Sequence, residues 1–139
     1  MKKKLFILVN TLSFFVSHRL EIAIAAKDKG YDVKIGYGEL GNIKTSILSK
    51  KGIDCFKLPL KRKGVNPFLE LWSLFYIWQI FYKQKPDIVH LITIKPYLYG
   101  GIAARLAKIP VVVSAVAGLG ILFNQKNFKN FFLKKFLYL

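Results

Sequence analysis

The sequence predicts an α/β domain built on a doubly wound parallel sheet. Short apolar runs recur along the chain, and segments with helical features separate them, with glycine or proline at most boundaries. Strands that alternate with helices are joined by right-handed crossovers, which place the strands in one parallel, Rossmann-like sheet. The length leaves room for one domain, residues 1–139, and no linker or repeat divides it.

The first elements in order are a strand, a helix and a second strand. Residues 4–10 form a continuous apolar run, which is typical of a strand covered on both faces. A helix is expected over residues 17–29, because Ser17 can cap its beginning and Gly30 permits a left-handed end. Residues 31–37 then alternate apolar and polar side chains with the period of a strand.

A short helix, a third strand and a long helix follow. The short helix is expected over residues 43–51 and ends before a glycine, and the strand over residues 53–58 ends at a proline. Asn66 then supplies an N-cap, and the proline after it opens a helix over residues 67–85. Another proline stops this helix.

Two more strands and two more helices complete the order. Residues 87–92 predict a fourth strand, and a helix over residues 96–108 contains small residues that allow close approach to the sheet. Residues 110–116 are strongly β-branched and predict a fifth strand. A Gly-Leu-Gly loop at residues 118–120 precedes a terminal helix expected over residues 127–139.

Ligands of such sheets bind beyond the carboxyl ends of the strands, near the point where the strand order reverses. This rule selects the loops at residues 10–17, 93–96 and 117–123. The first loop lacks the G-x-G-x-x-G fingerprint of dinucleotide-binding proteins. The loops offer no carboxylate pair or Ser-His-Asp arrangement, and two histidines with one cysteine are too few for an ordinary zinc site. We therefore expect no cofactor or metal, and a domain that holds a ligand.

The loops contain five candidate ligand-binding residues. His18 and Arg19 are expected in the first turn of a helix, where backbone N–H groups favour a phosphate. The alternative is that Arg19 is a solvated surface charge and His18 a packing residue. Lys95 is placed to meet an acceptor phosphate at the end of the fourth strand, with an ordinary surface lysine as the alternative. Gly118 and Gly120 would let backbone amides approach a ligand closely.

The charge of the chain predicts an anionic partner. Lys and Arg number 23 against seven Asp and Glu, which gives a net charge of +16. Nucleic acid, anionic lipid, a phosphorylated substrate or an acidic partner domain would each satisfy this charge. Nucleic acid is disfavoured, because the basic residues are dispersed and no nucleic-acid-binding motif is present.

Cysteine usage and hydropathy favour a cytoplasmic protein. Cys55 is the only cysteine, so a reducing compartment fits, and its apolar surroundings predict a buried structural thiol. Residues 5–9 are interpreted as a strand and not as a signal peptide. The most apolar later stretch, residues 71–82, is shorter than the ~20 residues of a membrane-spanning helix.

Several segments resemble family 4 glycosyltransferases, which have the two-domain GT-B fold. The block from His90 to Gly120 is the most specific, and it is similar to bacterial enzymes that extend lipid-linked oligosaccharides for capsule, O-antigen or glycoprotein assembly. The other matching segments are Ser17-His18-Arg19-Leu20, Gly30-Tyr31-Asp32-Val33 and Lys85-Pro86-Asp87-Ile88-Val89-His90. The similarity covers nearly the whole chain in the right order.

The resemblance implies the acceptor-side domain of a retaining transferase with a lipid-linked saccharide as acceptor. In the family, the nucleotide-sugar donor is a substrate held mainly by a second Rossmann-like domain, and nothing in this chain matches that domain. The chain is therefore expected to be C-terminally truncated, inactive alone and completed by a separate donor-domain chain.

The resemblance implies candidate residues for the acceptor site only, and none for catalysis. A second function also stays open. These candidates are His18, Arg19, Lys95, Gly118 and Gly120. The histidine that many family members have after the fifth strand is absent. A non-catalytic accessory subunit at the membrane surface is the alternative function.

Two of the expected helices could meet the anionic inner face of the plasma membrane. The helix over residues 67–85 is rich in large apolar side chains and follows a basic cluster at residues 61–63. The helix over residues 127–139 combines phenylalanines with lysines, as interfacial helices do. For the first helix, packing against the sheet is the favoured interpretation. Peripheral membrane association is therefore a hypothesis.

Overall fold

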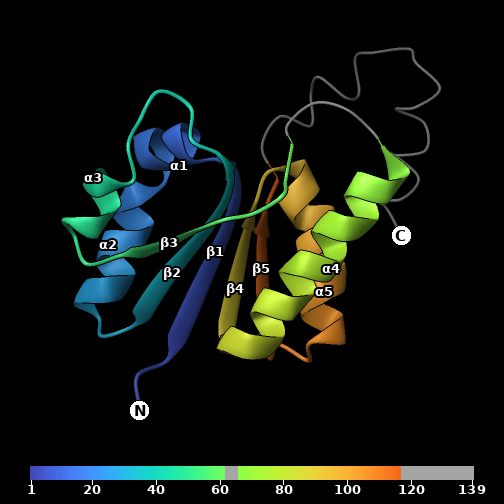
Figure 1. Cartoon of the computed structure of the whole chain (residues 1–139). Coiled ribbons are helices and arrows are strands. Elements are labelled where there is room, and N and C mark those ends of the chain that lie inside the picture. Colours follow the sequence, from blue (N-terminus) through green and yellow to red (C-terminus); the bar gives the residue numbers. More distant parts are fainter. Residues whose placement is uncertain (62–65, 117–139) are drawn as a thin grey trace.

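The computed structural model describes residues 1–61 and 66–116, and it confirms the α/β architecture. Within these residues five parallel strands form one sheet in the order β3-β2-β1-β4-β5 (Figure 1). The order reverses between β1 and β4, so the switch point lies between these two strands. The strands are β1 (Lys4–Thr11), β2 (Asp32–Glu39), β3 (Asp54–Lys57), β4 (Ile88–Ile92) and β5 (Val111–Ala115).

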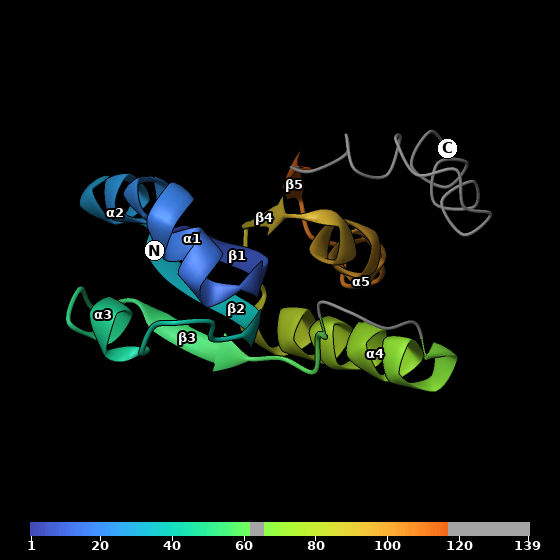
Figure 2. The same cartoon turned by 90° about the horizontal axis from the view of Figure 1, so that it is seen from above.

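Helices cover the two faces of this sheet (Figures 1 and 2). One face carries α1 (Leu12–His18), α2 (Leu20–Asp28) and α3 (Ser46–Ser49). The other face carries α4 (Pro67–Gln84), the π-helix η1 (Pro96–Gly100) and α5 (Gly101–Leu106). The expected helix over residues 96–108 is therefore an η1–α5 pair, and the expected helix over residues 43–51 is shorter.

Strand β1 holds both layers together, because its side chains alternate between two cores. Leu5, Ile7 and Val9 pack with α1, α2 and α3, whereas Phe6 and Leu8 pack with α4 and α5. All five side chains are buried. A central parallel strand needs apolar residues on both faces, which is why its sequence reads as a continuous apolar run.

The predicted start of the first helix at Ser17 is wrong. The chain enters α1 at Leu12, directly after β1, because Leu12 and Phe15 are both fully buried against the sheet. Ser17 is no N-cap: its hydroxyl lies 3.0 Å from the Ser13 carbonyl oxygen and 3.1 Å from that of Phe14, which is mid-helix bonding. The helix is then interrupted at Arg19 (φ −134°, ψ 0°) before α2 begins.

The capping signals of α4 are confirmed. The Phe68 amide donates to Asn66 Oδ1 over 3.1 Å, and the proline follows at the first helical position. Lys85 ends the helix in the left-handed conformation (φ 46°), ahead of the expected proline. Gly118, Gly120 and the terminal helix over residues 127–139 lie outside the described residues.

The expectation that most of α4 packs against the sheet is wrong for the side of the helix that faces away from the sheet. Ser73, Ile77 and Phe81 are the buried positions of this helix. On the opposite side Phe68 is 85% exposed and Trp72 53% exposed. Because residues four apart share a helix face, the burial is confined to one stripe.

Candidate functional site

His18 and Arg19 lie at the junction of two helices and not in the first turn of one, because Arg19 occupies the N-cap position of α2. The anion site at the backbone N–H groups there stays a prediction. His18 ends α1, and its Nδ1 lies 2.7 Å from Ser17 Oγ and 3.2 Å from the Phe14 carbonyl oxygen. Its ring stacks on Phe14, with centroids 4.5 Å apart. Arg19 links α1 to α2, and its amide donates to the Phe15 carbonyl.

His90 lies on the α1–α2 side of β4, where Ile88 and Ile92 also point. Its Nε2 is buried and has no hydrogen-bond partner. Burial lowers the pKa of His90, and the nearby charge of Arg19 lowers it further, against a backbone hydrogen bond at Val113 that raises it. The ring is therefore neutral near pH 7.

Lys95 lies on the other face, at the start of η1. Its Nζ forms an ion pair with Glu70 Oε1 of α4 at 2.8 Å, and the two side chains are only 16% and 15% exposed. The alternative of an ordinary surface lysine is therefore wrong, and the ammonium of Lys95 is already engaged by a carboxylate. A signal for Glu70 was present in the sequence, because it is the only acidic residue between Asp54 and Asp87 and lies in the first turn of α4.

Tyr99 joins this ion pair from the next turn of η1. Burial raises the pKa of Tyr99, and the negative charge of the nearby Glu70 carboxylate raises it further. The phenol therefore stays protonated and remains a hydrogen-bond donor. Glu70, Lys95 and Tyr99 thus connect α4 to η1 through polar contacts in a largely apolar layer.

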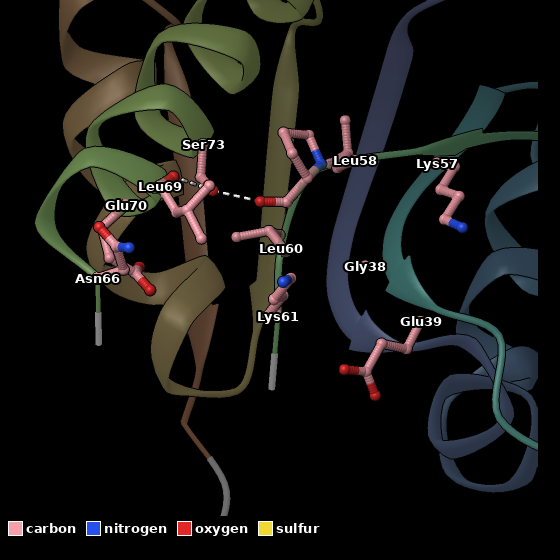
Figure 3. A pocket seen from close by; sticks show the side chains of 11 residues that line it. Gly38, Glu39, Lys57, Leu58, Leu60, Lys61, Asn66, Leu69, Glu70 and Ser73 are labelled. Carbon is pink, nitrogen blue, oxygen red and sulfur yellow. Dashed lines mark hydrogen bonds between the residues drawn. The ribbon is translucent and has the colours of Figure 1, made fainter. Parts of the chain in front are cut away.

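A cleft of about 590 Å³ opens beside this cluster, between the carboxyl ends of β2 and β3 and the first turns of α4 (Figure 3). The Ser73 hydroxyl donates to the Pro59 carbonyl and so ties α4 to the segment that follows β3. Both carboxylates and ammonium groups line the cleft. The lining residues are Gly38, Glu39, Lys57, Leu58, Pro59, Leu60, Lys61, Asn66, Leu69, Glu70 and Ser73.

The β2 side of this cleft was not predicted, although the sequence carries a signal for it. Residues 36–41 read Gly-Tyr-Gly-Glu-Leu-Gly, which matches G-x-G-x-x-G. The first two glycines lie inside β2, however, and α3 begins only at Ser46, so this is no dinucleotide fingerprint. A Cβ at Gly38 would collide with the Leu60 carbonyl oxygen, so glycine allows the chain after β3 to pass close to β2.

The structure thus separates the predicted site residues. His18 and Arg19 belong to the α1–α2 layer, and Lys95 belongs to the α4–η1 layer on the opposite face. Gly118 and Gly120 lie outside the described residues. The acceptor role of all five residues stays a prediction.

Residues 1–61 and 66–116 contain neither a candidate metal site nor a candidate membrane-spanning helix. In this part of the chain no group of three His, Cys, Asp or Glu side chains could hold a metal ion. None of its helices combines the length and hydropathy that crossing a bilayer requires.

Two curated bacterial enzymes are similar to this chain. The N,N'-diacetylbacillosaminyl-diphospho-undecaprenol alpha-1,3-N-acetylgalactosaminyltransferase of Campylobacter jejuni is 29% identical over 85 residues, which are 61% of this chain and 23% of that enzyme. The UDP-Gal:alpha-D-GlcNAc-diphosphoundecaprenol alpha-1,3-galactosyltransferase of Escherichia coli is 35% identical over 66 residues, 48% of this chain and 17% of that enzyme. The chain therefore matches less than a quarter of each relative's length.

Solved structures share the fold. MurG of Acinetobacter baumannii superposes with a TM-score of 0.64 and 23% identity over 96% of this chain and 39% of its own. A glycosyltransferase of Rickettsia africae superposes with a TM-score of 0.63 and 22% sequence identity. The match covers 82% of this chain and 30% of that protein. The family model described as glycosyl transferase 4-like matches residues 4–139. On this match, the chain belongs to the glycosyl transferase 4-like family.

Proposed function

We propose that this chain is the acceptor-side domain of a glycosyltransferase that moves a sugar from a nucleotide-sugar donor to a lipid-linked saccharide. The family match supports the reaction class, and the names of both curated relatives specify a diphospho-undecaprenol-linked sugar as acceptor. The observation that carries the proposal is the cleft at the carboxyl ends of β2 and β3, where charged and apolar side chains line the edge at which such sheets bind ligands.

The donor belongs to a second Rossmann-like domain in this proposal, on the same or on a separate polypeptide, and transfer retains the anomeric configuration. The partial coverage of the relatives supports this division, because the chain matches 39% of MurG. The 139 residues would then bind acceptor without turning it over. A non-catalytic accessory subunit at the membrane surface is the second candidate, and the exposed α4 face favours it.

A transfer assay with separate binding measurements tests the proposal. The chain is mixed with a short-chain prenyl diphosphate that carries N-acetylhexosamine and with labelled UDP-sugars, with and without a donor domain from a relative. We expect acceptor binding by the chain alone, and transfer only after the donor domain is added. Transfer by the chain alone would refute the division of labour. A failure to bind the lipid-linked sugar would refute the acceptor role.

The proposal places the domain on the anionic cytoplasmic face of the membrane. The outer face of α4 presents Phe68, Leu71 and Trp72, and Leu106 of α5 lies beside them in an apolar groove. Arg105 precedes Leu106 in the chain, and the whole chain carries a net charge of +16. Exposed aromatics on a strongly basic chain fit the interface of an anionic bilayer.

Vesicle co-sedimentation tests this location. The chain should pellet with vesicles that contain phosphatidylglycerol and not with neutral phosphatidylcholine vesicles. Phe68→Ser with Trp72→Ser should abolish pelleting, whereas Ile47→Ser, which removes an exposed apolar residue on the opposite layer, should not. Equal pelleting of both variants would show that charge alone, and not the α4 face, drives binding.

A further inference from the structure

Unpartnered oxygen atoms gather at the carboxyl edge of the sheet. Among the described residues, Asn10 Oδ1, Glu70 Oε2 and Thr93 Oγ1 are buried side-chain oxygens without a hydrogen-bond partner. Buried polar groups in folded proteins are nearly always paired, because an unmade hydrogen bond carries a free-energy penalty. Three such oxygens at one edge indicate a ligand that completes their hydrogen bonds.

The strand register brings two of these residues to the same edge of the sheet. Leu8 of β1 pairs with Leu91 of β4, and Asn10 and Thr93 each follow two residues after this pair. These strands flank the switch point of the sheet. Phe6 and Leu8 point toward α4 and α5, so the alternation of β1 turns Asn10 to the same face. That face also carries Glu70 and Lys95.

The backbone at Thr93 supports a role in binding. Its φ is 74°, a left-handed conformation that is unfavourable for a β-branched residue. Hydrogen bonds hold it on both sides: its amide donates to the Ala115 carbonyl over 3.2 Å, and its carbonyl accepts from the Tyr97 amide over 3.1 Å. Strain that the surroundings maintain is typical of ligand-binding sites, where it aims a side chain.

The chemistry of the three oxygens selects the class of ligand. The amide oxygen of Asn10 and the carboxylate oxygen of Glu70 only accept hydrogen bonds, and the Thr93 hydroxyl both donates and accepts. A phosphate at neutral pH brings acceptors almost exclusively and does not match them. A sugar ring brings several hydroxyl donors. We infer that Asn10 and Thr93, with Glu70 beside them, bind hydroxyl groups of a sugar ring at the β1–β4 edge.

This inference rests on the proposed function, which supplies two sources for such a ring, the acceptor saccharide and the sugar of the nucleotide donor. Three probes separate the possibilities: a short-chain prenyl diphosphate carrying N-acetylhexosamine, the same prenyl diphosphate without sugar, and a UDP-N-acetylhexosamine. Calorimetry measures each dissociation constant for the wild-type chain and its variants.

Thr93→Val is the main variant, because valine keeps the branched shape and removes only the hydroxyl. It should weaken binding of the sugar-bearing prenyl diphosphate roughly fivefold to tenfold, the effect of one neutral hydrogen bond, and leave the sugar-free probe unchanged. Asn10→Leu should act in the same direction. Thr45→Val makes the same chemical change at the cap of α3, where the hydroxyl forms no capping bond, and should change nothing.

A melting curve of the free variant separates binding from structure. Because the Thr93 hydroxyl has no partner in the free protein, Thr93→Val should melt at the same temperature as the wild type or higher. A lower melting temperature would show that the hydroxyl is structural and would overturn the inference.

The binding data then give distinct outcomes. If the variants weaken binding of the sugar-bearing prenyl probe and not of the sugar-free one, the sugar ring belongs to the acceptor. If they weaken binding of the UDP-sugar, the ring belongs to the donor. Unchanged binding of every probe by both variants would overturn the inference and leave the proposed function intact. A wild-type chain that binds no probe would overturn both.

Discussion

Breaking the Lys95–Glu70 ion pair should destabilise the fold before it affects any ligand. The two charged atoms lie 2.8 Å apart and their side chains are about 85% buried. At an effective dielectric constant of about 20, this separation gives a gross attraction of about 6 kcal/mol, of which desolvation of the two ions cancels a large part. We expect Lys95→Met to lower the free energy of unfolding by ~2–3 kcal/mol, because it leaves the Glu70 charge buried.

A double-mutant cycle measures the interaction itself. Urea unfolding of Lys95→Met, Glu70→Gln and the double variant should give a coupling of ~1–3 kcal/mol, with the double variant more stable than the sum of the single losses implies. High salt should change this coupling little, because the pair is shielded from solvent. Glu21→Gln, a first-turn glutamate on the exposed side of α2, is the matched control and should cost less than ~0.5 kcal/mol. Additive effects of the two substitutions would refute the structural role of Lys95.

Three further predictions follow from single residues. Burial and the charge of Arg19 hold the pKa of His90 below the ordinary 6.5, so the unfolded chain binds this proton more readily. The contribution of His90 to stability should therefore be complete above pH 6.5 and should be lost as the pH falls from there toward the folded pKa. In thermal melts between pH 8 and pH 5, the melting temperature of His90→Gln should decline less steeply than that of the wild type. Burial, and secondarily the charge of Asp54, raises the pKa of Cys55 from 9.0 to about 11. Iodoacetamide at pH 8 should therefore alkylate it roughly 100-fold more slowly in the native than in the urea-unfolded chain, and equal rates would contradict its burial. Gly38→Ala should lower the free energy of unfolding by ~2–3 kcal/mol, because the new Cβ meets the Leu60 carbonyl, whereas an unchanged urea midpoint would show that the segment after β3 yields easily.

Local patterns in the sequence predicted the strands because a parallel sheet imposes them residue by residue. The apolar run at residues 4–10 must alternate between two cores, and Asn66 must cap α4 where the chain leaves the loop. Each signal depends on neighbours within a turn or a strand. The same reasoning placed Ser17 at a helix start, because a serine before an apolar stretch fits a cap equally well. Only burial of Leu12 and Phe15 against the sheet decides that the helix begins earlier.

The candidate site was harder to predict because it depends on contacts between distant segments. Lys95 looks exposed in a loop sequence, and its partner Glu70 lies 25 residues away on another helix. Gly38 looks like part of a turn motif. Its actual role is to leave room for the Leu60 backbone, which crosses over it. Thr93 carries no sequence mark of a left-handed backbone, since threonine is among the residues that avoid it. The ion pair arises from the packing of α4 against η1, the Gly38 contact from the chain after β3 crossing β2, and the Thr93 conformation from hydrogen bonds to β5 and η1.

Helix α4 presents the two surfaces that the proposed lipid-linked acceptor would need. Successive residues of a helix are rotated by about 100°, so Phe68 and Glu70 point about 200° apart within the first turn. Glu70 lines the cleft, whereas Phe68 and Trp72 are exposed on the opposite side. The proposed substrate, with a sugar head and an apolar tail, would need a cleft with charged side chains next to an exposed apolar surface. The two sides of α4 supply both at the carboxyl edge of the sheet.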